Sequence, residues 1–107
     1  MYLDVDKKKD SFKIGVTIIQ SQIKAEVNAL VDTGASISCI SPRLVDRLQL
    51  VKQRMATPMY VRLADGNFGK PNPVCEIVEL EVMIEGKKTK LHCYLVEIGH
   101  GCIIGLD

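Results

Sequence analysis

A single Asp-Thr-Gly tripeptide, Asp32-Thr33-Gly34, offers the clearest chemistry in this chain of 107 residues. It follows the apolar run Ala29-Leu30-Val31, which reads as the end of a buried strand. A carboxylate at a strand end is held by the sheet and is still exposed to solvent or substrate, so it can act as a general acid or base. The same three residues are ordinary turn formers, and the tripeptide alone also fits a plain β-turn.

Two further segments follow this tripeptide along the chain. Cys102-Ile103-Ile104-Gly105 places two β-branched apolar residues before a glycine, and a glycine permits close approach of another backbone. Between the tripeptide and this segment, residues 61–67 contain Asp65-Gly66 flanked by alternating residues, which is a strong hairpin signal. The order is therefore an acidic turn, a hairpin and a short apolar strand ending in glycine.

In this order the three segments resemble the active-site loop, the flap and the second signature of the retropepsin-like, or retroviral-type, aspartic proteases. The resemblance runs from about Phe12 to Asp107. The Leu-Ala-Asp-Gly-Asn form of residues 63–67 resembles the proteases of plant pararetroviruses and long-terminal-repeat retrotransposons more than those of animal retroviruses, whose flaps are richer in glycine.

The resemblance implies an aspartic endopeptidase that cleaves a viral or retroelement polyprotein. Its chemistry needs two carboxylates that share one proton, because two like charges about 3 Å apart cannot both ionise. The chain has only one Asp-Thr-Gly motif, so the active site would lie on the two-fold axis of a homodimer. One Asp32 would activate a water, and the other would polarise the scissile carbonyl.

The resemblance also implies roles for particular residues. The catalytic set is Asp32, Thr33 and Gly34, where the Thr33 hydroxyl would bond to the partner loop and Gly34 would allow close backbone approach. The residues implied to bind an extended peptide substrate, in part through flap backbone groups, are Ala35, Ala64, Asp65, Gly66, Asn67 and Ile104. The resemblance implies neither a cofactor nor a metal ion.

The chain departs from the family pattern at its end. It stops at Asp107, directly after the Ile-Ile-Gly signature, whereas retroviral relatives continue with a short helix and a strand that joins the dimer sheet. We therefore expect this chain to dimerise weakly, although homodimerisation is needed for activity.

Hydrophobic periodicity predicts the elements that must position these residues. Strict alternation predicts strands over 12–20, 23–31, 76–84 and 88–96, with a short strand over 36–40. Ser41-Pro42 predicts the start of a helix over 42–50. Flap arms are expected over 57–64 and 68–70, and the prolines of Pro71-Asn72-Pro73 are expected to end that hairpin.

These elements predict an all-β fold, a small closed or nearly closed barrel with one short helix. The resemblance implies that this is an acid-protease barrel with a flap hairpin. Residues 1–11 are polar and are expected to form a loose N-terminal arm, although Tyr2, Leu3 and Val5 could join a sheet on dimerisation. Residues 12–107 are expected to form the retropepsin-like protease domain.

Composition narrows the class of protein. A net charge of +1 with 25% charged residues gives no case for binding nucleic acid or a membrane surface. The N-terminus has no signal-peptide pattern, so we expect an intracellular protein, in the host cytoplasm or in a virus or retroelement particle. Four cysteines without a Cys-x-x-Cys pair make a zinc site unexpected and predict free thiols, with Cys39 and Cys102 acting as small core residues.

Other functions remain open at this point. The chain also fits a cellular retroviral-like protease domain, as in ubiquitin-pathway shuttle proteins. A different class is a non-catalytic, monomeric binding module of retropepsin fold, although nothing structural in such a module requires Asp32. A small β-barrel of unrelated function is the remaining alternative.

Overall fold

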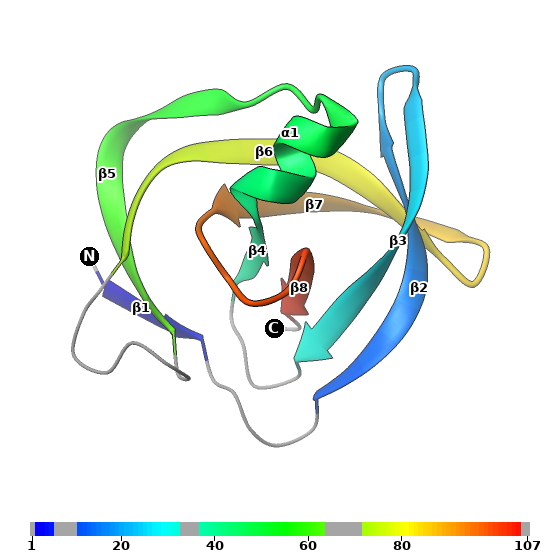
Figure 1. The fold of residues 1–107 in the computed structure, drawn as a ribbon, viewed down its shortest axis with the longest axis horizontal. Coiled ribbons are helices and arrows are strands. Elements are labelled where there is room, and N and C mark those ends of the chain that lie inside the picture. The colour runs from blue at the N-terminus through cyan, green and yellow to red at the C-terminus, as the bar shows by residue number, and fades with distance from the viewer. Residues whose placement is uncertain (1, 6–10, 33–36, 64–71, 106–107) are drawn as a thin grey trace.

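The computed structural model of the chain describes residues 2–5, 11–32, 37–63 and 72–105. These residues form strands and one short helix (Figure 1). The elements are β1 (Tyr2–Val5), β2 (Ser11–Gln20), β3 (Ile23–Asp32), β4 (Ser38–Ile40), α1 (Pro42–Leu48), β5 (Gln53–Leu63), β6 (Asn72–Ile84), β7 (Lys87–Leu95) and β8 (Cys102–Gly105).

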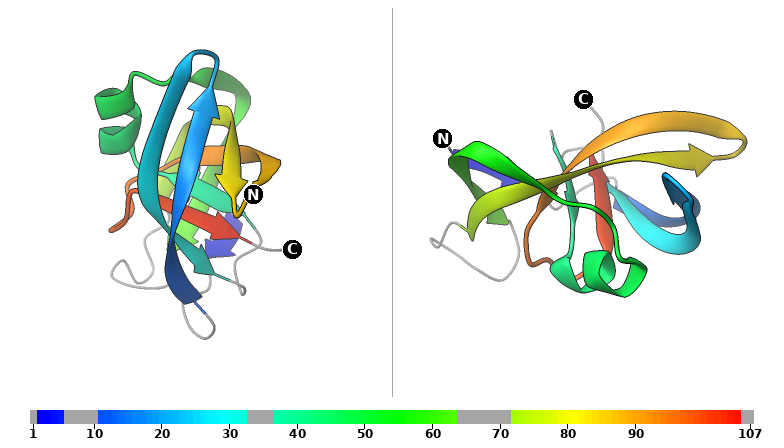
Figure 2. Two further views of the ribbon diagram at one scale, coloured as in Figure 1. Left: turned by 90° about the vertical axis from the view of Figure 1, so that its right-hand side faces the viewer. Right: turned by 90° about the horizontal axis from the view of Figure 1, so that it is seen from above.

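The strands close into a barrel. Their order is β1-β5-β6-β2-β3-β8-β4-β7, and a further pairing of β6 with β7 joins the last strand to the third. The closed ring is thus β6-β2-β3-β8-β4-β7, while β5 and β1 extend from β6 outside it (Figures 1 and 2). The prediction of an all-β barrel with one short helix is confirmed. The predicted flap tip lies outside the described residues.

Local sequence explains the two tight hairpins of the ring. Ser21 has a φ of 54° in the turn between β2 and β3, as expected for the predicted Ser21-Gln22 turn. Glu85 and Gly86 have φ values of 50° and 82°, so both central residues of the turn between β6 and β7 are left-handed. Two positive φ values are the mark of a type I′ turn, whose twist matches the strands that it joins.

Helix α1 begins and ends as its sequence predicts. The Ser41 Oγ accepts a hydrogen bond of 3.1 Å from the backbone N–H of Leu44, and Pro42 occupies the first helical position. Gln49 adopts a left-handed conformation and ends the helix. Leu44 and Val45 are buried against the barrel. No helix in the described part of the chain is long and apolar enough to span a bilayer.

Inward-facing residues of the ring form the core. Val16 and Ile18 of β2, Ala29 and Val31 of β3, and Val78, Leu80 and Val82 of β6 belong to one buried cluster. Because side chains alternate across a strand, each of these strands contributes every second residue to that cluster.

Two segments differ from the sequence-based expectation. Asn72 and Pro73 do not end the flap hairpin, because β6 starts at Asn72 and pairs Pro73 with Tyr60 of β5. The pairings of β6 with β2 and β7 begin further along, so at Pro73 it has a strand on one side only, a position where proline is tolerated. The other segment is β1, which was expected to be loose and instead pairs in parallel with residues Tyr60–Leu63 of β5.

Three of the four cysteines are packed inside the barrel. Cys39, Cys93 and Cys102 are fully buried, Cys75 is exposed, and all four are free. Burial, together with the neighbouring Cys102, raises the pKa of the Cys39 thiol to about 12. A hydrogen bond to Cys102, together with burial, raises the pKa of the Cys93 thiol far above its usual value. Burial of Cys39 and Cys102 confirms their predicted role as small core residues.

This arrangement predicts selective alkylation. In the native protein at pH 8, iodoacetamide should label Cys75 alone, whereas all four cysteines should react after denaturation, as counted by mass spectrometry. The pKa of the Cys39 thiol is about 12 in the folded protein, whereas an ordinary thiol has a pKa of about 8.5. The buried, protonated Cys39 therefore makes its full contribution to the free energy of unfolding below about pH 8.5, and that contribution is lost as the pH rises toward 12, because the unfolded chain releases the proton first. Rapid native labelling of Cys39 or Cys93 at pH 8 would contradict this packing.

Candidate active site

Asp32 is the last residue of β3 and lies between two other strands. It pairs antiparallel with Ser11 of β2 and parallel with Gly105 of β8. The prediction that a strand would deliver Asp32 is therefore confirmed. Its expected exposure is wrong, because Asp32 is only 2% exposed. At this position β8, from the other end of the chain, pairs with the edge of β3 that β2 leaves open.

Asp32 is unusual among the charged residues. Of the acidic and basic side chains that the structure describes, only Asp32 is buried. Asp32 takes part in at least one interaction with a neighbouring group. Aspartate is almost never fully buried unless it is paired, so its position at a strand end reflects more than a turn preference.

Ser38 holds the strand beside Asp32 and was not singled out by the sequence. Its Oγ accepts a hydrogen bond of 3.1 Å from the backbone N–H of Gly105, the residue that pairs with Asp32. β4 and β8 pair antiparallel at Cys39–Ile103 and Ile40–Cys102, so Gly105 lies two residues beyond this ladder on β8. The Ser38 hydroxyl satisfies that amide where the backbone ladder ends. The sequence feature that could have pointed to Ser38 is its hydroxyl side chain among the apolar residues Ile37 to Ile40.

The other predicted site residues are placed as follows. Ile104 pairs with Val31, is 4% exposed and belongs to the main core cluster. Its predicted contact with substrate stays a prediction. The remaining predicted catalytic and substrate-binding residues lie outside the described residues, and these are Thr33, Gly34, Ala35, Ala64, Asp65, Gly66 and Asn67.

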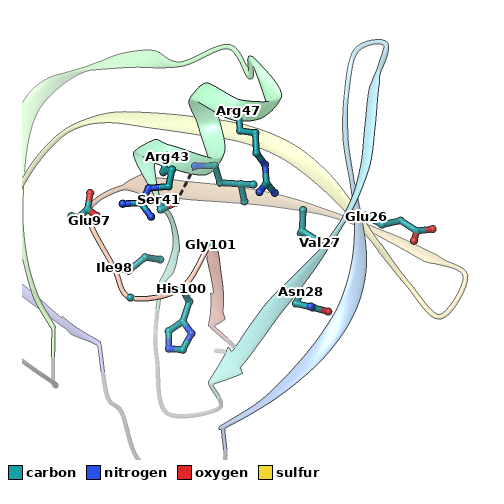
Figure 3. Close-up of a pocket in the computed structure, with 12 residues that line it drawn as sticks. Glu26, Val27, Asn28, Ser41, Arg43, Arg47, Glu97, Ile98, His100 and Gly101 are labelled. Carbon is teal, nitrogen blue, oxygen red and sulfur yellow. Dashed lines mark hydrogen bonds between the residues drawn. The ribbon is translucent and has the colours of Figure 1, made fainter.

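A hollow of about 460 Å³ opens elsewhere, between α1, β3 and residues 97–101 (Figure 3). On β3 it reaches Asn28, four residues before Asp32, or roughly 13 Å along the strand. Val27 points toward the hollow and Glu26 points away from it (Figure 3). The Ser41 hydroxyl there is occupied as the helix cap, and no hydrogen bond in the described part of the chain joins it to His100. This hollow therefore shows no paired nucleophile and base.

The described residues show no metal centre. Within residues 2–5, 11–32, 37–63 and 72–105, no three His, Cys, Asp or Glu side chains gather closely enough to hold an ion. On the exposed face of the β6–β7 hairpin, the Nδ1 atom of His92 lies 3.3 Å from the Oε2 atom of Glu79. Within these ranges, Asp32 is the group best placed for acid–base chemistry.

Known proteins resemble this chain over most of its length. The family model described as "gag-polyprotein putative aspartyl protease" matches residues 19–107. Among solved structures, the EIAV protease complexed with the inhibitor HBY-793 is similar to this chain with a TM-score of 0.64 and 19% identity, over 91% of this chain and 83% of that one. At that identity the likeness shows the fold. A search of curated proteins found no match.

A second solved structure is the retroviral protease-like domain of Ddi1 from Leishmania major. It has a TM-score of 0.54 and 25% identity to this chain, over 87% of this chain and 71% of that one. Both structures are of retroviral-type protease folds by their descriptions, one from a virus and one from a cellular protein.

The Ser38 hydrogen bond predicts how this part of the barrel responds to substitution. Ser38→Ala should lower the free energy of unfolding by about 1–3 kcal/mol, because it leaves the partly buried Gly105 amide without its acceptor. Ser38→Thr keeps the hydroxyl and should lose less. Urea denaturation measures both. Equal losses for the two variants would contradict a role for the hydroxyl.

Proposed function

The chain belongs to the gag-polyprotein aspartyl protease family, and on that premise we propose that it is an endopeptidase that cleaves a viral or retroelement polyprotein with two Asp32 carboxylates at the axis of a homodimer. Its fold is that of the retroviral-type aspartic proteases. We further propose that it acts inside the host cell or within the particle, which is where such a polyprotein is assembled.

The burial of Asp32 at the end of β3 carries this proposal. Removing a carboxylate from water is costly, and a protein that needed only a turn at this point would gain nothing from it. A carboxylate fixed by strands on both sides meets the requirement that catalytic groups be held in place before the substrate arrives. The family match supports the reading of this residue as the catalytic one.

In the proposed mechanism the two Asp32 side chains hold one proton and one water between them. The ionised carboxylate takes a proton from the water as the water oxygen attacks the scissile carbonyl carbon. The protonated carboxyl group donates its proton to the carbonyl oxygen, which becomes a hydroxyl in the tetrahedral intermediate. The C–N bond then breaks as the leaving nitrogen takes a proton from one carboxyl group and the other, ionised carboxylate takes a proton from a hydroxyl of the intermediate. This leaves a carboxylic acid product and restores a dyad that holds one proton.

Neighbouring residues complete the proposed site. Thr33 would stiffen the dyad through a hydrogen bond to the partner loop, and Gly34 would let the backbone approach the carboxylates. Ala35, Ile104 and the flap residues 64–67 would contact an extended peptide, with flap backbone groups pairing to it as to a β-strand.

A second candidate is a cellular protease domain of the same fold. The similarity to the Ddi1 domain, which comes from a cellular protein, favours it. The two candidates differ in substrate rather than in chemistry. Cleavage of a polyprotein that contains this chain, at the borders of its domains, would support the retroelement or viral role.

The mechanism predicts that Asp32→Asn abolishes cleavage. Catalytic acid–base groups contribute about 10²–10⁴-fold, so peptide turnover should fall at least about a hundredfold. Asp46 is an exposed aspartate on α1, and Asp46→Asn is the matched control that should keep normal activity. Circular dichroism checks that both variants fold. Near-normal turnover by folded Asp32→Asn would end the aspartic-protease proposal.

Assembly gives a second prediction. Because each chain supplies one Asp32, specific activity should fall on dilution below the dimer dissociation constant. Sedimentation at the same concentrations should show the fraction of dimer falling in parallel. Constant specific activity from a chain shown to be monomeric would contradict the two-carboxylate mechanism.

A further inference from the structure

We infer that β1 is a latch, which holds one end of the β5–β6 strand pair against the face of the barrel that carries Asp32. We call this end the arm; it consists of residues 59–63 of β5 and residues 72–74 of β6. The inference rests on the proposed function in one respect, because it makes release of β1 a step in the entry of a peptide substrate.

The arm packs on the face of β3 and β8 to which Asp32 belongs. Val61 and Val74 of the arm are fully buried, and both belong to the second core cluster together with Ile103 of β8. Leu30 of β3 pairs with Ile103 and packs against the same cluster. Because side chains alternate along a strand, Asp32 shares the face of Leu30. The arm and the carboxylate therefore lie on the same side of this sheet.

An irregular segment joins the arm to the rest of β5. The ladder between β5 and β6 contains the pairs Arg54–Glu76 and Met59–Val74, so β5 advances five residues where β6 advances two. Extra residues in one strand interrupt the ladder and bend the strand. Residues 56–58 in this segment are exposed. Since β5 lies outside the closed ring, the arm can turn about this segment while the ring stays closed.

β1 attaches the arm a second time, at the outer edge of β5. It pairs in parallel with residues 60–63, whereas the described pairing of β6 with β5 ends at Val61. Within the part of the chain that the structure describes, Arg62 and Leu63 therefore have β1 as their only strand partner. Figure 1 shows β1 beside the lower end of β5, as this register requires.

This attachment is weak enough to open. β1 has four residues and so forms few backbone hydrogen bonds, each of modest net strength, and it can detach without unfolding of the barrel. While β1 is paired, the arm stays on its buried contacts, and an extended peptide that approaches Asp32 from this side meets the arm. Once β1 detaches, the arm can turn outward and admit the peptide.

Hydrogen exchange of backbone amides, followed by mass spectrometry, tests the latch without reference to activity. The double variant Leu3→Pro/Asp4→Pro removes two successive N–H groups of β1. Because alternate residues of a strand bond to a given neighbour, one of the two removed groups faces β5. Exchange of residues 60–63 should become about tenfold faster or more, while exchange in β2 and β3 stays unchanged.

Leu3→Val/Asp4→Thr is the matched control. It keeps both N–H groups and places residues that favour strands at the same positions, so residues 60–63 should exchange at the wild-type rate. If the proline variant does not fold, deletion of residues 1–5 provides the same test. At protein concentrations where sedimentation shows equal fractions of dimer, the proline variant should also have a KM for peptide about threefold lower or more, because a larger fraction of arms is open.

The outcomes separate the latch from the proposed function. Unchanged exchange of residues 60–63 in the folded proline variant would overturn the inference and leave the proposed function standing. Faster exchange with an unchanged KM would mean that β1 pairs with the arm without controlling entry, which would also overturn the inference. Faster exchange in the proline variant of a protein that cleaves no peptide even as wild type would support the latch and count against the proposed function.

Discussion

The parallel pairing of β3 with β8 is the contact on which the site depends. It brings Gly105, near one end of the chain, beside Asp32, and Ser38 fixes that glycine from its other side. Because β8 is an inner strand between β3 and β4, with Cys102, Ile103 and Ile104 all buried, it can shift only if the barrel opens. The position of one carboxylate is thus a property of the closed barrel rather than of a flexible loop.

One chain supplies only one of the two carboxylates that the proposed mechanism needs. Among the acidic side chains whose burial the structure describes, Asp32 alone is buried, so one chain offers a single carboxylate of this kind. Chemistry that needs two carboxylates sharing a proton must take the second from another chain. In the proposed mechanism the barrel supplies the position of one Asp32, and a second chain supplies the other.

Features set by nearby residues could be predicted from the sequence, and features set by distant ones could not. The alternation over 23–31, the Ser41-Pro42 helix start and the turn at Glu85-Gly86 are local, and the structure confirms them. The pairing of Asp32 with Gly105 and the role of Ser38 both depend on β8, so neither local pattern nor propensity indicated them. Tyr2, Leu3 and Val5 were expected to be able to join a sheet on dimerisation, but their parallel pairing with β5 of the same chain is long-range and was not expected. Pro73 was misread for a related reason, because its tolerance in β6 depends on which neighbouring strands are absent at that point.

Catalysis by the proposed mechanism needs one Asp32 from each of two chains. Mixing wild-type protein with Asp32→Asn protein tests this requirement directly. Wild-type protein is combined with increasing amounts of Asp32→Asn protein, at total concentrations well above the dimer dissociation constant, and allowed to exchange subunits. If each active dimer needs two intact chains, a tenfold excess of Asp32→Asn should reduce the activity of the wild-type protein to about one tenth, because most wild-type chains then sit in mixed dimers. Activity that stays unchanged by the excess, with exchange verified, would show that a single chain is sufficient and would contradict the account.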